Sequence, residues 1–170
     1  ARVFIVGRDG VSYGAKNQEG ISWKQKYINE VRPQIPDEDW ARVHFVGQIP
    51  YKNFVQLLQL STVHVYLTYP FVLSWSLLEA MSIGCTIVAS DTRPLHEAII
   101  HNETGRLVDF FDYNGLVSQI VDLLNNPAER KRLGANARQF AVTHYDLHSV
   151  CLPRQIEWVK RLGGLLGGLA

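Results

Sequence analysis

Four neighbouring residues have the types and spacing needed to bind a phosphorylated ribose. Ser74, Trp75 and Ser76 stand at the expected start of a helix, and Glu79 lies about one turn inside it. The first amides of a helix lack partners within the helix and lie at the positive end of its dipole, so they favour a phosphate. A carboxylate nearby accepts hydrogen bonds from two adjacent hydroxyls, such as those of a ribose. These residues predict a nucleotide site.

The same residues also have a purely structural interpretation. Ser76-Leu77-Leu78-Glu79 fits a capping box, in which Glu79 accepts a hydrogen bond from the amide of Ser76 and binds no ligand. The sequence pattern alone leaves both interpretations open.

Strands and helices alternate along the first two thirds of the chain, and the last third is helical. Apolar runs predict strands at 2–6, 43–46, 63–67, 86–89 and 106–108. Helical periodicity and end signals predict helices at 23–31, from Pro50, from Ser74 or Ser76 to Gly84, at 94–100, 113–125, 127–143 and 148–162. We therefore expect an α/β fold, a doubly wound, Rossmann-like parallel sheet whose continuous apolar strands are buried. Such sheets bind ligands beyond the carboxyl ends of their strands.

The composition excludes several classes of protein. The chain has 170 residues, 46% of them hydrophobic and 19% charged, which suits one soluble globular domain. A net charge of +1 gives no reason to expect nucleic acid as a partner, and no apolar run is long enough for a transmembrane segment. Two cysteines and six histidines lack metal-ligand spacing, so we expect no metal. The glycine fingerprint at Gly7-Arg8-Asp9-Gly10 is incomplete, so we expect no dinucleotide and no other cofactor.

The two ends of the chain suggest a part of a longer protein. The sequence enters an apolar run directly after Ala1, and residues 163–170 are rich in glycine. We expect a single domain at 1–162 followed by a flexible tail at 163–170.

Six short motifs resemble, in order, those of the family 4 glycosyltransferases, which are retaining enzymes of the GT-B architecture. The resemblance covers most of residues 2–146. The motifs are Phe45-Val46-Gly47, Leu78-Glu79-Ala80-Met81 followed by Gly84, Ile87-Val88-Ala89-Ser90-Asp91, Glu97, Gly105-Arg106-Leu107-Val108 and Ala137-Arg138. The resemblance implies the C-terminal, donor-binding half of such an enzyme.

The resemblance also implies roles for individual residues. Glu79 would hold the ribose of the donor, the amides of Ser74, Trp75 and Ser76 its diphosphate, and the loop at Gln48 and Ile49 would frame the base. The glycine-containing loop that ends at Gly10 is placed to border the same cleft. No catalytic residue is assigned, because an acceptor-binding N-terminal domain would have to supply any base.

Two departures from the family pattern affect this interpretation. Phe71 stands where the family usually has a glutamate that contacts the donor sugar, and Arg93-Pro94 replaces a pair of glycines. A phenyl ring cannot accept a hydrogen bond from a sugar hydroxyl. Either sugar recognition around Phe71 is rearranged, with Ser74, Trp75 or Ser76 contributing, or donor turnover is weak. We favour the rearrangement.

The sequence thus predicts the donor-binding domain of a hexosyltransferase that moves a sugar from a nucleoside diphosphate sugar to an acceptor. Its expected partners are the nucleotide sugar and the protein's own N-terminal domain, and this chain alone should have no transferase activity. A cytoplasmic location, with contact to the inner face of the membrane, fits this function. Two alternatives stay open: a nucleotide-binding module without chemistry, and a nucleotide-sugar epimerase or phosphorylase of the same architecture.

Overall fold

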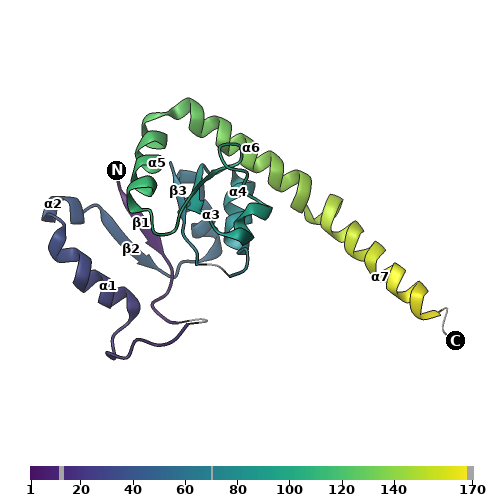
Figure 1. The fold of residues 1–170 in the computed structure, drawn as a ribbon, viewed down its shortest axis with the longest axis horizontal. Helices are drawn as coiled ribbons and strands as arrows, with labels where there is room; N and C mark the ends of the chain where they lie inside the picture. The colour runs from purple at the N-terminus through teal and green to yellow at the C-terminus, as the bar shows by residue number, and fades with distance from the viewer. Residues whose placement is uncertain (12–13, 70, 168–170) are drawn as a thin grey trace. The chain divides into compact units, whose positions relative to one another are not determined.

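The computed structural model describes residues 1–11, 14–69 and 71–167, and it forms two compact units. Unit 1 comprises Ala1–Phe54 and unit 2 comprises Val55–Ala170, so that the boundary falls within one helix. The sequence predicts one domain over 1–162. The units are described separately below, and Figure 1 labels their elements.

Unit 1 contains a two-stranded parallel sheet and helices from the segment between the strands. Its elements are β1 (Val3–Val6), α1 (Trp23–Val31), the 3₁₀ helix η1 (Arg32–Gln34), α2 (Asp37–Trp40), β2 (Val43–Gly47) and the start of α3 (Tyr51–Leu60). The side chain of Ser22 accepts a hydrogen bond from the amide of Gln25 and begins α1, and Pro33 opens η1 directly after that helix. The short helix α2 was not predicted.

Unit 2 contains a three-stranded parallel sheet in the order β3-β4-β5, with helices around it. Its strands are β3 (His64–Tyr66), β4 (Ile87–Ser90) and β5 (Arg106–Val108). Its helices are α4 (Trp75–Ile83), the 3₁₀ helix η2 (Arg93–Glu97), α5 (Tyr113–Asn125), α6 (Pro127–Tyr145), the π-helical segment η3 (Leu147–Cys151) and α7 (Leu152–Gly167). The parallel strands and the alternation of strands with helices confirm the α/β prediction.

The core of unit 2 forms around its central strand. All four residues of β4 are buried, and Val88 packs with Val108, Leu123 and Leu133. The helix α4 ends at Gly84, whose positive φ of 86° closes the helix, and there it meets Gly134 of α6. Because a Cβ atom on Gly134 would lie 2.3 Å from the carbonyl oxygen of Gly84, only glycine allows this approach.

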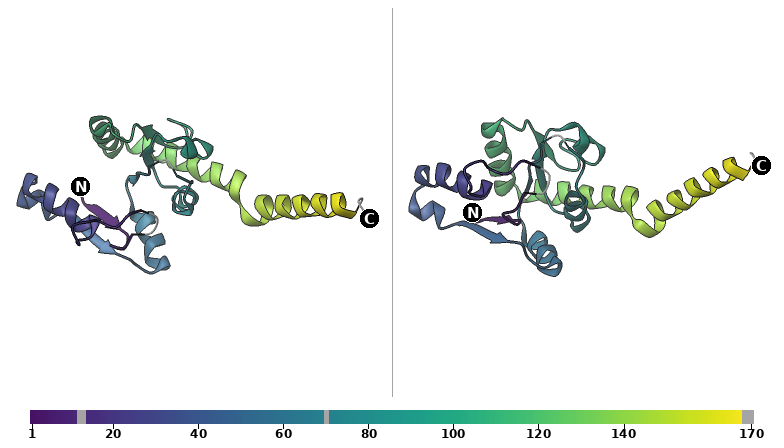
Figure 2. Two further views of the ribbon diagram at one scale, coloured as in Figure 1. Left: turned by 60° about the horizontal axis from the view of Figure 1, so that its bottom comes forward. Right: turned by 90° about the horizontal axis from the view of Figure 1, so that it is seen from below.

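The prediction of buried strands is right for β4 and wrong for β1. The four side chains of β1 are exposed, because β1 pairs with β2 alone and a cavity lies between it and α1. The predicted last helix also differs, since α7 continues to Gly167 and extends away from the rest of unit 2 (Figure 2). Residues 163–167 of the predicted tail are therefore helical, and 168–170 lie outside the described residues.

Candidate functional site

The carboxyl ends of β3, β4 and β5 meet at one edge of the sheet of unit 2. The side chain of Ser90, at the end of β4, accepts a hydrogen bond from the amide of Thr68 (2.9 Å) and donates one to the carbonyl oxygen of Thr68 (2.8 Å). The amide of Asp91 donates to the carbonyl oxygen of Val108 over 2.6 Å. These bonds hold Thr68, which follows β3, to the end of β4, and hold the end of β4 to β5.

The helix α4 starts from this edge, as the sequence predicts. Ser74 is its N-cap, and its hydroxyl accepts a hydrogen bond from the amide of Ser76 at a long 3.3 Å and lies 3.0 Å from the hydroxyl of Ser76. The Trp75 side chain is 85% exposed. The structure thus places two hydroxyls and the first amides of an exposed helix start side by side, and such a group can bind a phosphate.

Glu79 lies one turn further along α4 and is half-buried between the buried residues Leu77 and Ala80. Among the residues that the structure describes, no hydrogen bond or ion pair occupies its carboxylate. The capping box is not formed, because the N-cap is Ser74 and the amide of Ser76 bonds to the hydroxyl of Ser74. A half-buried carboxylate without a partner is costly, so Glu79 is suited to accept hydrogen bonds from a ligand.

The remaining predicted site residues lie in two places. Phe71 is in the loop before α4 and is 60% exposed. Gly10, Gln48 and Ile49 belong to unit 1, where they follow the ends of β1 and β2. The structure therefore brings the predicted phosphate and ribose residues together in unit 2 and the predicted base residues together in unit 1.

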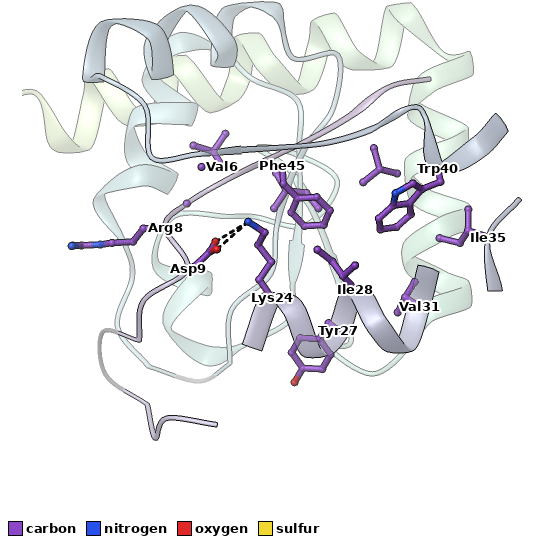
Figure 3. Close-up of a pocket in the computed structure, with 14 residues that line it drawn as sticks. Val6, Arg8, Asp9, Lys24, Tyr27, Ile28, Val31, Ile35, Trp40 and Phe45 are labelled. Atoms are coloured by element: carbon purple, nitrogen blue, oxygen red, sulfur yellow. Dashed lines mark hydrogen bonds and ion pairs between the residues drawn. The ribbon is translucent and has the colours of Figure 1, made fainter. Parts of the chain in front are cut away.

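Unit 1 contains a cavity of about 460 Å³ between α1 and its sheet (Figure 3). Its walls are apolar side chains, among them Ile28, Val31 and Phe45. At its mouth Lys24 forms an ion pair of 2.9 Å with Asp9, which neutralises both charges, and Arg8 points away from the apolar walls. The apolar walls of this cavity offer a diphosphate no hydrogen-bond donor. It reaches Gly47, one residue short of Gln48.

One polar pair at the edge of the sheet in unit 2 was not predicted. Asp91 follows β4 directly, and its Oδ1 lies 2.5 Å from Nε2 of His96 on η2. Both side chains are about half exposed. The sequence does show an acidic residue at the end of a buried strand and a histidine five positions later. This spacing alone does not predict a contact, because the two side chains meet through the 3₁₀ turn of η2.

The described residues contain neither a metal-binding cluster nor a helix suited to span a membrane. Within 1–11, 14–69 and 71–167, no three His, Cys, Asp or Glu side chains are grouped so as to hold a metal ion. No helix in the described parts of the chain combines the length and the apolar character that crossing a bilayer requires.

The parallel α/β fold, with a helix starting at the carboxyl edge of its sheet, is the Rossmann-like fold found in GT-B glycosyltransferases. HepE of Anabaena, solved in complex with UDP, matches 96% of this chain and 41% of its own with a TM-score of 0.74 and 20% identity. The model of the family of glycosyl transferases group 1 matches residues 2–140, and the chain belongs to this family.

Two curated relatives support the same assignment. An uncharacterized glycosyltransferase of Methanocaldococcus jannaschii is 28% identical over 105 residues, which are 61% of this chain and 27% of the relative. The N-acetyl-alpha-D-glucosaminyl L-malate synthase of Bacillus anthracis is 30% identical over 98 residues, which are 58% of this chain and 25% of the relative. The matched part of the chain thus spans about a quarter of the length of these relatives.

Proposed function

We propose that this chain is the donor-binding part of a retaining glycosyltransferase of family 4, which moves a sugar from a nucleoside diphosphate sugar to an acceptor. The observation that carries the proposal is the arrangement at the start of α4. An exposed helix N-terminus with two hydroxyls lies one turn from Glu79, whose half-buried carboxylate has no partner among the described residues. These groups match a diphosphate and a ribose diol, respectively.

In this proposal the protein acts mainly on the leaving group. Negative charge builds on the diphosphate as the bond to the sugar breaks, and the amides at the start of α4 stabilise that charge. The amides are aligned before the reaction, because they belong to the first turn of α4, which Ser74 caps. The acceptor would attack from the face of the departing diphosphate, so that the anomeric configuration is kept.

The structural relatives support a nucleotide sugar as the donor. HepE has been solved with UDP and also with UDP-glucose, the latter structure with a TM-score of 0.73 and 19% identity to this chain. We expect binding without a metal ion, so EDTA should leave the affinity unchanged.

Phe71 favours a second candidate, a nucleotide-binding module without transferase activity. Its exposed ring stands where the resemblance implies a glutamate that contacts the sugar. A product analysis of a protein that contains this chain and its acceptor domain would separate the two. A transferase yields a glycoside with the anomeric configuration of the donor, whereas a module yields none.

Calorimetry on the chain itself tests the donor site. We expect UDP, GDP or ADP to bind, and Glu79→Ala to weaken binding about tenfold to a hundredfold, because a charged hydrogen bond contributes about 1.5–3 kcal/mol. Glu103→Ala is the matched control, since Glu103 is exposed and precedes β5, at the opposite edge of the sheet. Equal affinities of the Glu79 and Glu103 variants would contradict the site, and binding of no nucleotide would contradict the function.

A further inference from the structure

The loops after β3 and β5 carry three aromatic side chains that the proposed site does not use. Tyr69 lies in the first loop, and Phe110 and Phe111 lie in the second. The ring centroids of Tyr69 and Phe110 are 5.8 Å apart and those of Phe110 and Phe111 are 5.1 Å apart, and both pairs meet edge to face. We call these three residues the aromatic triad.

The sheet places the aromatic triad beyond the end of β4. This strand lies between β3 and β5, and hydrogen bonds join Thr68 to Ser90 and Asp91 to Val108 at its end. The contact between Tyr69 and Phe110 follows directly after these bonds. The triad therefore connects the two outer loops at the same edge from which α4 starts.

The aromatic triad is held in shape but remains open to solvent. Asp109 accepts a hydrogen bond from the amide of Phe111 and Asp112 accepts one from the amide of Gly115, both of 2.8 Å, and these bonds fix the loop. Tyr69 is nevertheless 68% exposed and Phe111 66% exposed. A fixed group of rings that leaves so much apolar surface in water indicates a binding surface.

Two polar groups at the same carboxyl edge of the sheet indicate the kind of ligand. Asp91 directly follows β4. Its side chain pairs with that of His96, and both side chains are about half exposed. A pyranose has ring faces of C–H groups and a rim of hydroxyls, so it requires aromatic surface and charged hydrogen-bonding groups together. A purely apolar ligand would leave the Asp91–His96 pair without a function.

We propose that the aromatic triad binds the pyranose ring of the donor by stacking, while Asp91 and His96 bind its hydroxyls. This inference rests on the proposed function, because the sugar reaches the triad attached to the diphosphate at α4. Tyr69 and Phe111 would then determine the affinity for the sugar, whereas Glu79 and the amides of α4 would determine the affinity for the nucleotide.

The test compares each nucleoside diphosphate with its sugar ester on the chain itself. Calorimetry measures the affinity for UDP, GDP and ADP and for their glucose, galactose, mannose and N-acetylglucosamine esters. We expect at least one ester to bind more tightly than its nucleotide. Tyr69→Ala and Phe111→Ala should reduce the affinity for that ester about threefold to tenfold and leave the nucleotide affinity unchanged. Tyr69→Phe should restore the affinity, since it keeps the ring.

Trp158→Ala serves as the control, because it removes an aromatic side chain of similar exposure (63%) from α7. A direct readout is saturation-transfer NMR, in which irradiation of the aromatic protons of the chain should saturate the sugar protons of the bound ester. Thermal melting of each variant checks the fold, and we expect little change because both rings are exposed.

Five results would overturn the inference. Sugar esters that bind no more tightly than their nucleotides, or a loss of affinity equal to that of Trp158→Ala, would leave the nucleotide site intact and show that the triad does not bind the sugar. If Tyr69→Ala and Phe111→Ala weaken the binding of the nucleotide as much as that of its sugar ester, the triad contacts the nucleotide and not the sugar. Dimers in sedimentation that Phe111→Ala abolishes would assign the triad to self-association. Failure of the unaltered chain to bind any nucleotide would reject the proposed function and, with it, this inference.

Discussion

The two units use apolar residues in opposite ways. All buried side chains of the described residues lie in unit 2, where β4 is enclosed on both faces. In unit 1 the side chains of β1 are exposed, and a cavity of about 460 Å³ lies beside α1. The groups that fit a diphosphate and a ribose lie in the well-packed unit. Since precise positioning requires rigid support, this difference explains why the candidate site is built on α4 and β4.

The largest expected effect comes from removing one apolar side chain from each unit. Leu77 is fully buried in unit 2, so Leu77→Ala should cost about 2–5 kcal/mol of unfolding free energy. Ile28 is half-buried and already borders the cavity of unit 1, so Ile28→Ala should cost less than about 1.5 kcal/mol. Urea unfolding followed by circular dichroism measures both. Equal losses would show that unit 1 is packed as tightly as unit 2.

A smaller effect is expected from the contact between α4 and α6. Gly134→Ala places a methyl group against the carbonyl oxygen of Gly84 and should cost about 1–3 kcal/mol. Gly163→Ala is the matched control, because a Cβ atom there meets no atom within 4 Å and alanine favours a helix. The melting temperature should fall for the first variant and not for the second. A neutral Gly134→Ala would show that the two helices separate easily.

The smallest expected effect is a dependence of stability on pH through His64 of unit 2. Burial lowers the pKa of His64 below its usual value, and Nε2 of the ring is buried without a hydrogen bond. The unfolded chain therefore binds a proton more readily than the folded chain, and stability should decline as the pH falls below about 6.5.

This decline should be shallower in His64→Asn, whereas His148→Asn, which removes an exposed imidazole, should keep it. Urea unfolding at pH 7.5, 6.5 and 5.5 gives the three slopes. The same slope in all three proteins would mean that the ring of His64 is hydrated in solution.

Local patterns in the sequence predicted most of the fold. The α5 helix begins and ends as predicted, because Asp112 caps it and Pro127 begins the next helix. The start of α4 and the position of Glu79 on it followed from the same kind of local signal. The exposure of β1 did not, since four apolar residues have the same pattern whether or not a helix packs closely on them.

The remaining parts of the site depend on contacts between distant segments. The triad joins residues 69 and 110, and the pair of Asp91 and His96 forms only because the segment after β4 turns as a 3₁₀ helix. A single sequence gives no measure of such distances. The predicted roles of Glu79, Ser74 and Gln48 in donor binding stay predictions until a ligand is bound.

In the proposed function, the first amides of α4 bind the diphosphate of the donor. Nitrogen–proton correlation spectra of the labelled chain, recorded during titration with UDP, GDP and ADP, test it most directly. We expect the amide signals of Trp75 and Ser76 to shift most and to saturate together. Glu79→Ala should weaken the affinity while the same amide signals still shift. Signals that shift instead around the cavity beside Lys24, or no saturable shift at α4 with any of the three nucleotides, would contradict it.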